Sequence, residues 1–348
     1  MTKQEKINAF DPNGVGLDNG HFIGLPFNEA DAKVVLLPVP WDVTVSYNDG
    51  TASASENILK ASVQLDLYDA DVKDAWKMGI YMRPPDQIWK RRSELLRPKA
   101  AAYIEWLEAG SPEADKVLME ESLKQINQAC GDLNKWLGEE TRDLMERGKL
   151  VGIIGGDHST PLGYLETLAS YYPTFGILQI DAHMDLREAY EGFIWSHASI
   201  FYNALKIPAI KSLVQVGIRD YCEAEVAVAA KEQERVAVFY DANIRAALYR
   251  GKTYDRICDE MISKLPDHVY ISFDIDGLAP IFCPNTGTPV PGGFDFQEIM
   301  YLANKVVESG RKLIGFDLCE VAGVGHEWEG NVAARILYKL ANLAGADR

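Results

Sequence analysis

The chain has 348 residues, of which 47% are hydrophobic and 25% charged, and its 35 Lys and Arg against 51 Asp and Glu leave a formal net charge of −16. This composition is that of a globular protein with a sizeable core, and it excludes a disordered or fibrous chain. The acidity argues against a nucleic-acid partner, which needs clustered basic residues, and suits a cationic small molecule or metal ions while also favouring solubility.

Short β-branched runs alternate with longer amphipathic stretches along the chain. Most of the runs are continuously apolar, which is typical of strands covered on both faces, and we predict strands at Lys33–Val39, Leu150–Ile154, Phe175–Ile180, Leu213–Val216, Val236–Phe239, His268–Phe273 and Leu313–Phe316. The predicted helices are Ser53–Leu65, Pro112–Arg147, Pro161–Ala169, Glu223–Lys231, Thr253–Lys264, Phe296–Ser309 and Val332–Ala344. Strand followed by helix, repeated, favours an α/β fold with a mostly parallel sheet between two helical layers.

One stretch, Tyr68–Gly110, breaks this rhythm. It contains the run Arg83-Pro84-Pro85, the adjacent Arg91 and Arg92, and three of the seven tryptophans. These residues suit either an excursion packed on the domain surface or an arm that contacts a neighbouring subunit, since protein interfaces favour aromatic residues and arginine. We expect a single domain over residues 1–348, in which residues 1–32 form an N-terminal arm and residues 68–110 form this excursion.

Nothing in the chain predicts secretion or membrane insertion. The first residues, MTKQEKINAFDPNG, include no apolar signal region, and no apolar run approaches the roughly 20 residues that a membrane span needs. Five scattered cysteines without a C-x-x-C pair are typical of reduced thiols rather than of a disulfide framework or a zinc cage. We therefore expect a cytoplasmic protein with no membrane partner.

Three of the predicted strands run directly into acidic and histidine-bearing segments. Leu150–Ile154 is followed by Gly-Gly-Asp-His-Ser-Thr (155–160), Phe175–Ile180 by Asp-Ala-His-Met-Asp (181–185), and His268–Phe273 by Asp-Ile-Asp-Gly (274–277). In a parallel sheet these are carboxyl ends, where open α/β folds place their sites. Burying several carboxylates without positive charge is costly, and no Lys or Arg lies inside these motifs. Metal ions are the natural compensation.

The spacing of these motifs indicates two metal ions. Side chains two apart in an extended segment point to the same face, so the ligands of Asp-x-His-x-Asp and of Asp-x-Asp converge. Such a set of hard oxygens with two imidazoles exceeds one tetrahedral zinc and suits two bridged divalent ions of the Mn or Ni type. A water between two such ions loses its proton near neutral pH, so we expect hydrolysis. Phosphoester hydrolysis also fits two metals, but no arginine clamp lies near the motifs.

The three motifs together resemble the metal-binding signatures of the ureohydrolases, the arginase/agmatinase family, and the resemblance runs from about Val34 to the C-terminus. It implies the three-layer arginase-type α/β fold and a binuclear metal site. Carried across residue by residue, one ion would be held by His158, Asp181, Asp185 and Asp274. The other would be held by Asp181, His183, Asp274 and Asp276, with Asp181 and Asp274 bridging.

The same resemblance implies three residues around the substrate. His197, in Ser196-His197-Ala198-Ser199, would carry a proton to the leaving amine, although it could instead be a structural histidine. Glu320 would grip the guanidinium group, which pairs bidentately with a carboxylate. Thr288 lies in a run, Thr286-Gly287-Thr288-Pro289, that matches the family's loop after the third signature, and we expect it to bind substrate.

Two departures from the arginase and agmatinase patterns bear on the substrate. Trp328 follows Glu320 by eight residues and could cover a small delocalised cation, or it could pack under the last helix. The run 327–332, together with the run 40–47, resembles the branch that includes nickel-dependent guanidine hydrolases and biguanide (metformin) hydrolases, and the Tyr68–Gly110 excursion is similar to that branch as well. The family usually has Gly-Pro after a Gly-Thr near the first helix, whereas here Gly50-Thr51 is followed by Ala-Ser-Ala-Ser (52–55), and we expect serine caps to preserve that helix.

The sequence therefore predicts a binuclear-metal hydrolase that cleaves a C–N bond of a small guanidinium compound through a metal-bridging hydroxide. Guanidine or a substituted guanidine or biguanide is the first expected substrate, and agmatine is the alternative. Asp185 would help to hold the hydroxide. A formiminoglutamase, with its anionic substrate, would want an arginine at the rim, where Arg187 stands beside acidic residues. The chain could also be a non-catalytic partner subunit of a heteromeric ureohydrolase. The resemblance implies a homo-oligomer, trimer or hexamer, or a hetero-oligomer with a homologous subunit.

Overall fold

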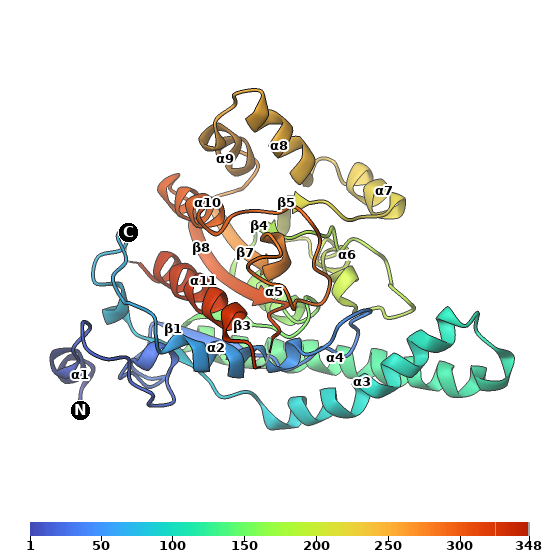
Figure 1. Ribbon diagram of the computed structural model, residues 1–348, viewed down its shortest axis with the longest axis horizontal. Helices are drawn as coiled ribbons and strands as arrows, with labels where there is room; N and C mark the ends of the chain where they lie inside the picture. Colours follow the sequence, from blue (N-terminus) through green and yellow to red (C-terminus); the bar gives the residue numbers. More distant parts are fainter. Residues whose placement is uncertain (324, 347–348) are drawn as a thin grey trace.

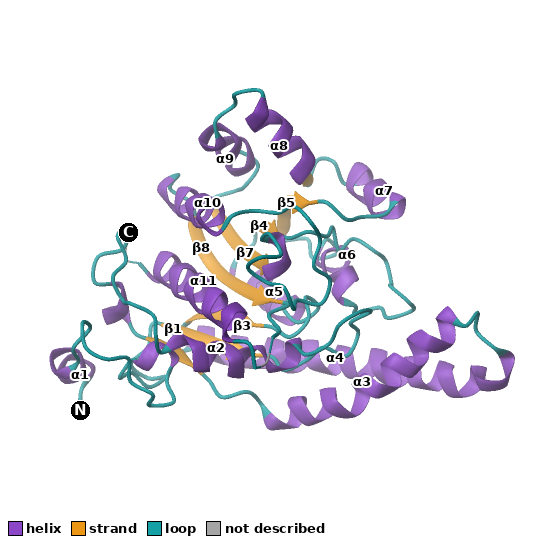
Figure 2. Ribbon diagram, in the orientation of Figure 1, coloured by secondary structure: helices purple, strands orange, loops and turns teal. Residues whose placement is uncertain are grey.

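A single parallel sheet forms the centre of the molecule. In the computed structural model, which describes residues 1–323 and 325–346, eight strands lie in the order β2-β1-β3-β8-β7-β4-β5-β6 (Figures 1 and 2). The strands are β1 (Val34–Pro38), β2 (Ile80–Met82), β3 (Leu150–Ile154), β4 (Phe175–Ile180), β5 (Ile210–Ile218), β6 (Val236–Tyr240), β7 (His268–Asp274) and β8 (Lys312–Cys319). All neighbouring pairs are parallel, so the carboxyl ends of the strands share one edge.

Helices cover both faces of the sheet. One hydrophobic cluster packs α2 (Ala54–Ser62), α8 (Asp241–Tyr249), α9 (Tyr254–Ile262), α10 (Phe296–Glu308) and α11 (Glu327–Gly345) on one face. A second cluster packs α3 (Gln87–Glu108), α4 (Lys116–Glu146), α5 (Leu162–Tyr171), α6 (Ile200–Ala204) and α7 (Glu223–Lys231) on the other. The predicted three-layer α/β fold is confirmed.

All seven predicted strands and all seven predicted helices form, with shifts of a few residues at their ends. Four further helices, α1 (Lys3–Ala9), α3, α6 and α8, and the three-residue edge strand β2 were not predicted. The helix α2 survives the loss of Gly-Pro, but the expected serine cap is wrong: Ser53 makes no capping hydrogen bond through its side chain. A short 3₁₀ turn, Thr51–Ser53, leads into the helix instead.

The Tyr68–Gly110 excursion is part of the sheet and of a helical layer. It supplies β2 and the whole of α3, which pairs with α4 and extends beyond the sheet at one end of the molecule (Figure 1). Trp89 of α3 lies between Trp41 and Trp136, with ring centroids 5.8 and 5.6 Å apart, and so joins the helix to both the end of β1 and α4. Its possible contact with another subunit stays a prediction.

The N-terminal segment is anchored to the body. Lys3 Nζ donates to the Met78 carbonyl at 2.6 Å, and residues 22–25 are buried. Glu29 accepts hydrogen bonds from Arg83 Nε (2.5 Å) and Arg147 Nη1 (2.6 Å), and these bonds lower the pKa of its carboxyl to about 2 although burial opposes the shift.

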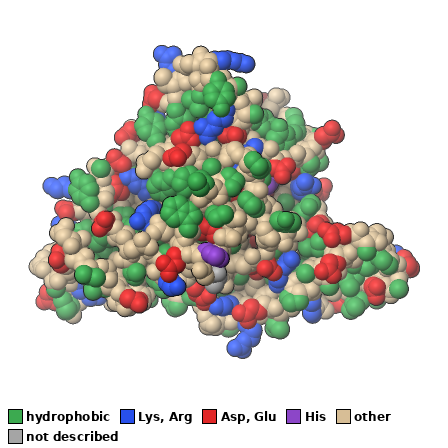
Figure 3. Space-filling view, in the orientation of Figure 1, with side chains coloured by type: hydrophobic (Ala, Val, Ile, Leu, Met, Phe, Trp, Pro, Cys, Tyr) green, Lys and Arg blue, Asp and Glu red, His purple; other side chains and the backbone are tan. Residues whose placement is uncertain are grey.

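The surplus of acidic residues is spread out. On the face shown in Figure 3, acidic and basic side chains intermingle without one dominant patch. No helix among the residues described is both long and apolar enough to cross a bilayer. All five cysteines are free thiols.

Candidate active site

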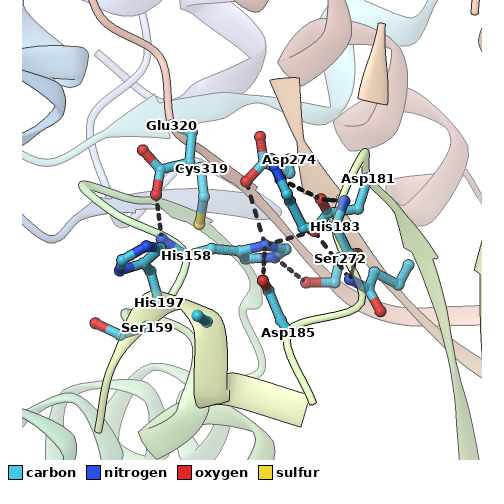
Figure 4. A network of polar contacts seen from close by, with 12 residues as sticks. His158, Ser159, Asp181, His183, Asp185, His197, Ser272, Asp274, Cys319 and Glu320 are labelled. Atoms are coloured by element: carbon cyan, nitrogen blue, oxygen red, sulfur yellow. Dashed lines mark hydrogen bonds and ion pairs between the residues drawn. The ribbon is translucent and has the colours of Figure 1, made fainter. Parts of the chain in front are cut away.

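The candidate site lies at the carboxyl ends of four adjacent central strands, β3, β8, β7 and β4. Each strand is an apolar run that the sheet buries, and the first polar residues beyond each run therefore meet at one edge. These segments bring together all six predicted metal ligands and Glu320. Figure 4 labels all of these residues except Asp276.

The first group of ligands surrounds one imidazole nitrogen. His158 Nδ1 lies 3.0 Å from Asp181 Oδ2, 3.2 Å from Asp185 Oδ2 and 3.3 Å from Asp274 Oδ2. It is buried and makes no hydrogen bond of acceptable geometry to any of them. Nitrogen and oxygen lone pairs thus face one point from several directions, as the predicted ligand set for one ion requires.

The second group of predicted ligands shares Asp181, which follows β4, with the first group. His183 Nδ1 lies 3.1 Å from Asp276 Oδ2 and 3.6 Å from Asp181 Oδ1. Asp181 therefore offers one oxygen to each group, as a bridging ligand would. Asp181 Oδ1 also accepts the His183 backbone N–H at 2.6 Å, and the second oxygen of Asp274 accepts the Asp276 backbone N–H at 2.8 Å. The bridging roles of both aspartates stay predictions.

A buried acid that the sequence analysis missed fixes the orientation of His158. Ser272 Oγ donates its proton to Asp317 Oδ2 at 2.7 Å and lies 3.0 Å from His158 Nε2. Because its only proton is engaged, the serine oxygen accepts the N–H of His158 Nε2, which leaves Nδ1 as the coordinating nitrogen. Asp317 also accepts the Phe273 N–H at 3.1 Å. Asp317 is the only acid inside the apolar run of β8, and this position in the sequence could have indicated its role.

Two buried glutamines support the other side of the site. Gln179 Nε2 donates to Asp181 Oδ2 at 2.9 Å and to the His183 carbonyl at 3.0 Å. Gln215 Nε2 in turn donates to Gln179 Oε1 at 2.6 Å. These side chains come from β4 and β5 and hold Asp181 in place.

Without metal, protons balance the buried carboxylates. Burial disfavours a charged imidazole, yet the surrounding aspartates raise the pKa of both His158 and His183 well above the ordinary value. Burial, together with the charges of neighbouring acids, raises the pKa of Asp274 well above its usual range and that of Asp185 to about 7. The buried carboxylates of this site therefore need positive charge to balance them, and two divalent ions would supply that charge in place of protons. The residues present fit the two predicted ions.

Glu320 follows β8 and lies beside the first group of ligands. Its Oε1 accepts the backbone N–H of His158 at 3.0 Å, while its Oε2 is buried and has no hydrogen-bond partner. Burial, with the nearby charge of Asp157, raises the pKa of this carboxyl well above its usual range. A cationic hydrogen-bond donor would stabilise this unpaired oxygen, because burying an acid without a partner is costly in free energy.

The loop that carries Thr288 forms one wall beside Glu320. A Cβ at Gly287 would lie 3.2 Å from Glu320 Oε2, so only hydrogen at this position leaves the oxygen room. Thr286 Oγ1 donates to the Glu320 carbonyl at 2.8 Å, and Glu329 of α11 accepts the Asn285 N–H. Thr288 itself is half-buried in this loop, and its contact with substrate stays a prediction.

Trp328, in the first turn of α11, contacts the same loop from another side. Its indole N–H donates to the Ile281 carbonyl at 2.8 Å, and 51% of the residue is exposed. It is therefore not packed under the last helix, which was one of the two interpretations of the sequence. This contact gives Trp328 a role in holding the loop, and its stacking on a cation stays a prediction.

His197 begins a 3₁₀ turn, His197–Ser199, and is half-buried. Its Nδ1 lies 3.3 Å from Ser196 Oγ, and its backbone N–H donates to Thr44 Oγ1 at 3.4 Å. Burial, followed by the positive charges of His183 and His158, lowers the pKa of the ring to about 3. The imidazole is therefore neutral near pH 7, and its role as a proton carrier stays a prediction.

Two of the site residues adopt a backbone conformation that is rare for side chains with a Cβ. Asp185 has φ = 54° and Glu320 has φ = 62°, both in the left-handed region. Such conformations cost about 1–3 kcal/mol each and cluster at functional sites.

The fold and this site define the class: a three-layer α/β protein with candidate ligands for two metal ions and a buried acid that can receive a cation. Comparison with known families agrees, because the Arginase family matches residues 32–341, and the chain belongs to that family. Members of this family are hydrolases of C–N bonds in guanidino compounds and use two divalent metal ions.

Individual members of the family share less than a third of their residues with this chain. The chain is 29% identical over 322 residues to the N(1)-aminopropylagmatine ureohydrolase of Thermus thermophilus, which covers 92% of each chain. It is 26% identical to the agmatinase of Halalkalibacterium halodurans, over 86% of this chain and 88% of that one. Among solved structures, the proclavaminate amidino hydrolase of Streptomyces clavuligerus superposes with a TM-score of 0.72 at 20% identity, over 96% of this chain and 99% of the other. That structure supports the fold.

Proposed function

We propose that this chain binds a guanidinium cation on Glu320 and hydrolyses one of its C–N bonds with the help of two divalent ions. The observation that carries the proposal is the buried, unpartnered Glu320 Oε2 beside the ring of metal ligands around His158. A guanidinium N–H supplies the donor and the charge that this oxygen lacks.

Under this proposal, Glu320, Asp185 and His197 have different roles in the reaction. The two ions, when bound, supply a Lewis acid and a water of lowered pKa. Glu320 orients the cation, and Asp185 accepts a hydrogen bond from the attacking water. His197, neutral at pH 7, accepts a proton and hands it to the departing amine. The products are a urea-type compound and ammonia or an amine.

Two substrate classes compete for this site. The run 40–47 and Trp328 favour guanidine or a substituted guanidine or biguanide. The names of two relatives, an aminopropylagmatine ureohydrolase and an agmatinase, favour a guanidine with a long amino-alkyl tail, such as agmatine. We expect the metal to be Ni or Mn, the chain to form a homo-oligomer or to pair with a homologous subunit, and the protein to act in the cytoplasm.

The test is a substrate panel on metal-loaded protein. The chain, stripped of metal and reloaded with Ni²⁺ or Mn²⁺, is assayed for release of urea, ammonia or amine from guanidine, a biguanide, agmatine, aminopropylagmatine and arginine. Turnover of guanidine or a biguanide supports the first class, whereas turnover of agmatine or aminopropylagmatine alone supports the second. Two bound ions with no turnover of any of these compounds would overturn the proposal, and no bound ion would favour the non-catalytic partner.

Two variants separate metal from substrate binding. Asp181→Asn removes the acid shared by both groups of ligands, so we expect loss of bound metal and of activity. Glu320→Gln keeps the shape of the side chain but removes its charge, so we expect metal to be retained. Its kcat/KM should fall about 10- to 150-fold, because a hydrogen bond to a charged group contributes about 1.5–3 kcal/mol.

A further inference from the structure

The helix α3 contacts a loop that borders the active site, here called the 42–52 loop (Asp42–Ala52). Arg97 Nη1 donates to the carbonyls of Val43 (2.9 Å) and Val45 (2.6 Å), and the arginine side chain is only 16% exposed. Its Nε lies 3.6 Å from Asp49 Oδ2 in the same loop. One side chain therefore binds the loop at three points.

A second residue of α3 holds the start of the loop. Ser93 Oγ donates to Asp42 Oδ1 at 3.2 Å and accepts the Asp42 N–H at 3.3 Å. The other oxygen, Asp42 Oδ2, accepts the backbone N–H groups of Gly50 (2.9 Å) and Ala52 (3.1 Å). The two ends of the loop are thus tied to each other and to α3.

The inner side of the same loop contacts the catalytic groups. Thr44, between the two carbonyls that Arg97 binds, donates through Oγ1 to Asp157 Oδ2 at 3.2 Å and accepts the His197 N–H. The Asn48 carbonyl and Glu320 Oε2 lie 3.4 and 3.2 Å from where a Cβ of Gly287 would stand. The loop therefore lies between α3 on one side and, on the other, His197 and Gly287, which is the residue beside Glu320 Oε2.

We propose that Arg97 is a positioning residue for the reaction, acting through the 42–52 loop on His197 and on the Gly287 segment beside Glu320. The proposal rests on the proposed function for its catalytic readout, while its effect on the loop is measurable without any substrate. Under this proposal, the Tyr68–Gly110 excursion holds the 42–52 loop of its own subunit in place. The metal ligands come from strand ends and not from this loop, so loss of Arg97 should spare metal binding.

The experiment compares three variants of the full chain. Arg97→Met removes every donor but keeps the length of the stem, and Arg97→Lys restores one charged donor group. Arg92→Met is the matched control, since Arg92 lies on the same helix but pairs with Asp132 (3.0 Å) and stacks on Trp89. Each variant is measured for bound metal, for kcat and KM on the best substrate, and for amide hydrogen exchange in residues 42–52.

We expect Arg97→Met to exchange the 42–52 amides at least tenfold faster and to lose about 10- to 100-fold in kcat/KM, since small misplacements of reacting groups carry such penalties. Arg97→Lys should recover part of both, and Arg92→Met should match the parent chain. Unchanged exchange in Arg97→Met would overturn the proposal even if the parent chain showed no turnover. Loss of metal in Arg97→Met, or equal losses in Arg92→Met, would overturn it as well, because the effect would then be general destabilisation.

Discussion

Gly287→Ala tests the space beside Glu320 most sharply. The added Cβ would lie 3.2 Å from Glu320 Oε2 and 3.4 Å from the Asn48 carbonyl, closer than most Cβ contacts. Gly287 is outside the left-handed region, so alanine imposes no backbone strain there. The methyl group must therefore displace the carboxylate or the loop by a few tenths of an ångström.

We expect Gly287→Ala to change substrate binding and turnover but not metal binding. If the displacement breaks the hydrogen bond between Glu320 Oε2 and a guanidinium N–H, kcat/KM should fall about 10- to 150-fold, corresponding to about 1.5–3 kcal/mol. Bound metal should be unchanged, because Gly287 lies against Glu320 rather than against a metal ligand.

The assay is steady-state kinetics on the best substrate, with metal content measured in parallel. Gly131→Ala serves as the control, because its Cβ would meet nothing closer than Trp195 Nε1 at 3.6 Å and its helix should gain about 0.5–1 kcal/mol. A Gly287→Ala enzyme with the parent kcat/KM would refute the assignment of this space to the guanidinium.

Three further predictions concern metal binding and stability. Asp317→Asn should weaken metal binding about 10- to 100-fold in a metal titration, because Asp317 holds His158 through a serine and outer partners of ligands have effects of this size. An unchanged affinity would contradict the role of Asp317. Metal affinity should fall about tenfold between pH 8 and pH 6, since the pKa of Asp185 is raised to about 7 and a ligand must lose its proton to bind; a titration that is flat over this range would rule the reasoning out. Glu29→Gln should lower the free energy of unfolding by about 1–2 kcal/mol at pH 7, after allowance for solvent screening of its bonds to Arg83. The pKa of Glu29 is lowered from 4.5 to about 2, so this stabilisation is complete above pH 4.5 and is lost as the pH falls towards 2. Urea unfolding at pH 7 and pH 3 should therefore show the difference from the parent chain shrinking, and a constant difference would contradict it.

The central strands were predictable because burial on both faces demands continuous apolar runs. Strand β2 was not, since three residues at the sheet edge form too short a run to stand out. Helix α3 was missed because Pro98 lies inside it and its apolar residues are few. Helix α1 carried a readable signal, because Thr2 and Glu5 form a capping box, but its short length hid it.

The meeting of the predicted metal ligands at one edge of the sheet could be expected for a related reason. They directly follow strands, so the register of the sheet fixes where they meet. Asp317 and Ser272 lie within strands, and only the pairing of β7 with β8 brings them to His158. The contact of Arg97 with the 42–52 loop depends on how α3 packs, which no local pattern specifies.

The left-handed backbone at Asp185 and Glu320 bears on what selection has maintained in this chain. Glycine would relieve the strain at either position, so a lineage that needed only the fold would gain stability by replacing both acids. Mutation alone would soon find such changes, because each needs a single residue. An acid at each of these two positions, in place of the glycine that the backbone would favour, is what a site built for turnover requires and what a silent scaffold has no need of.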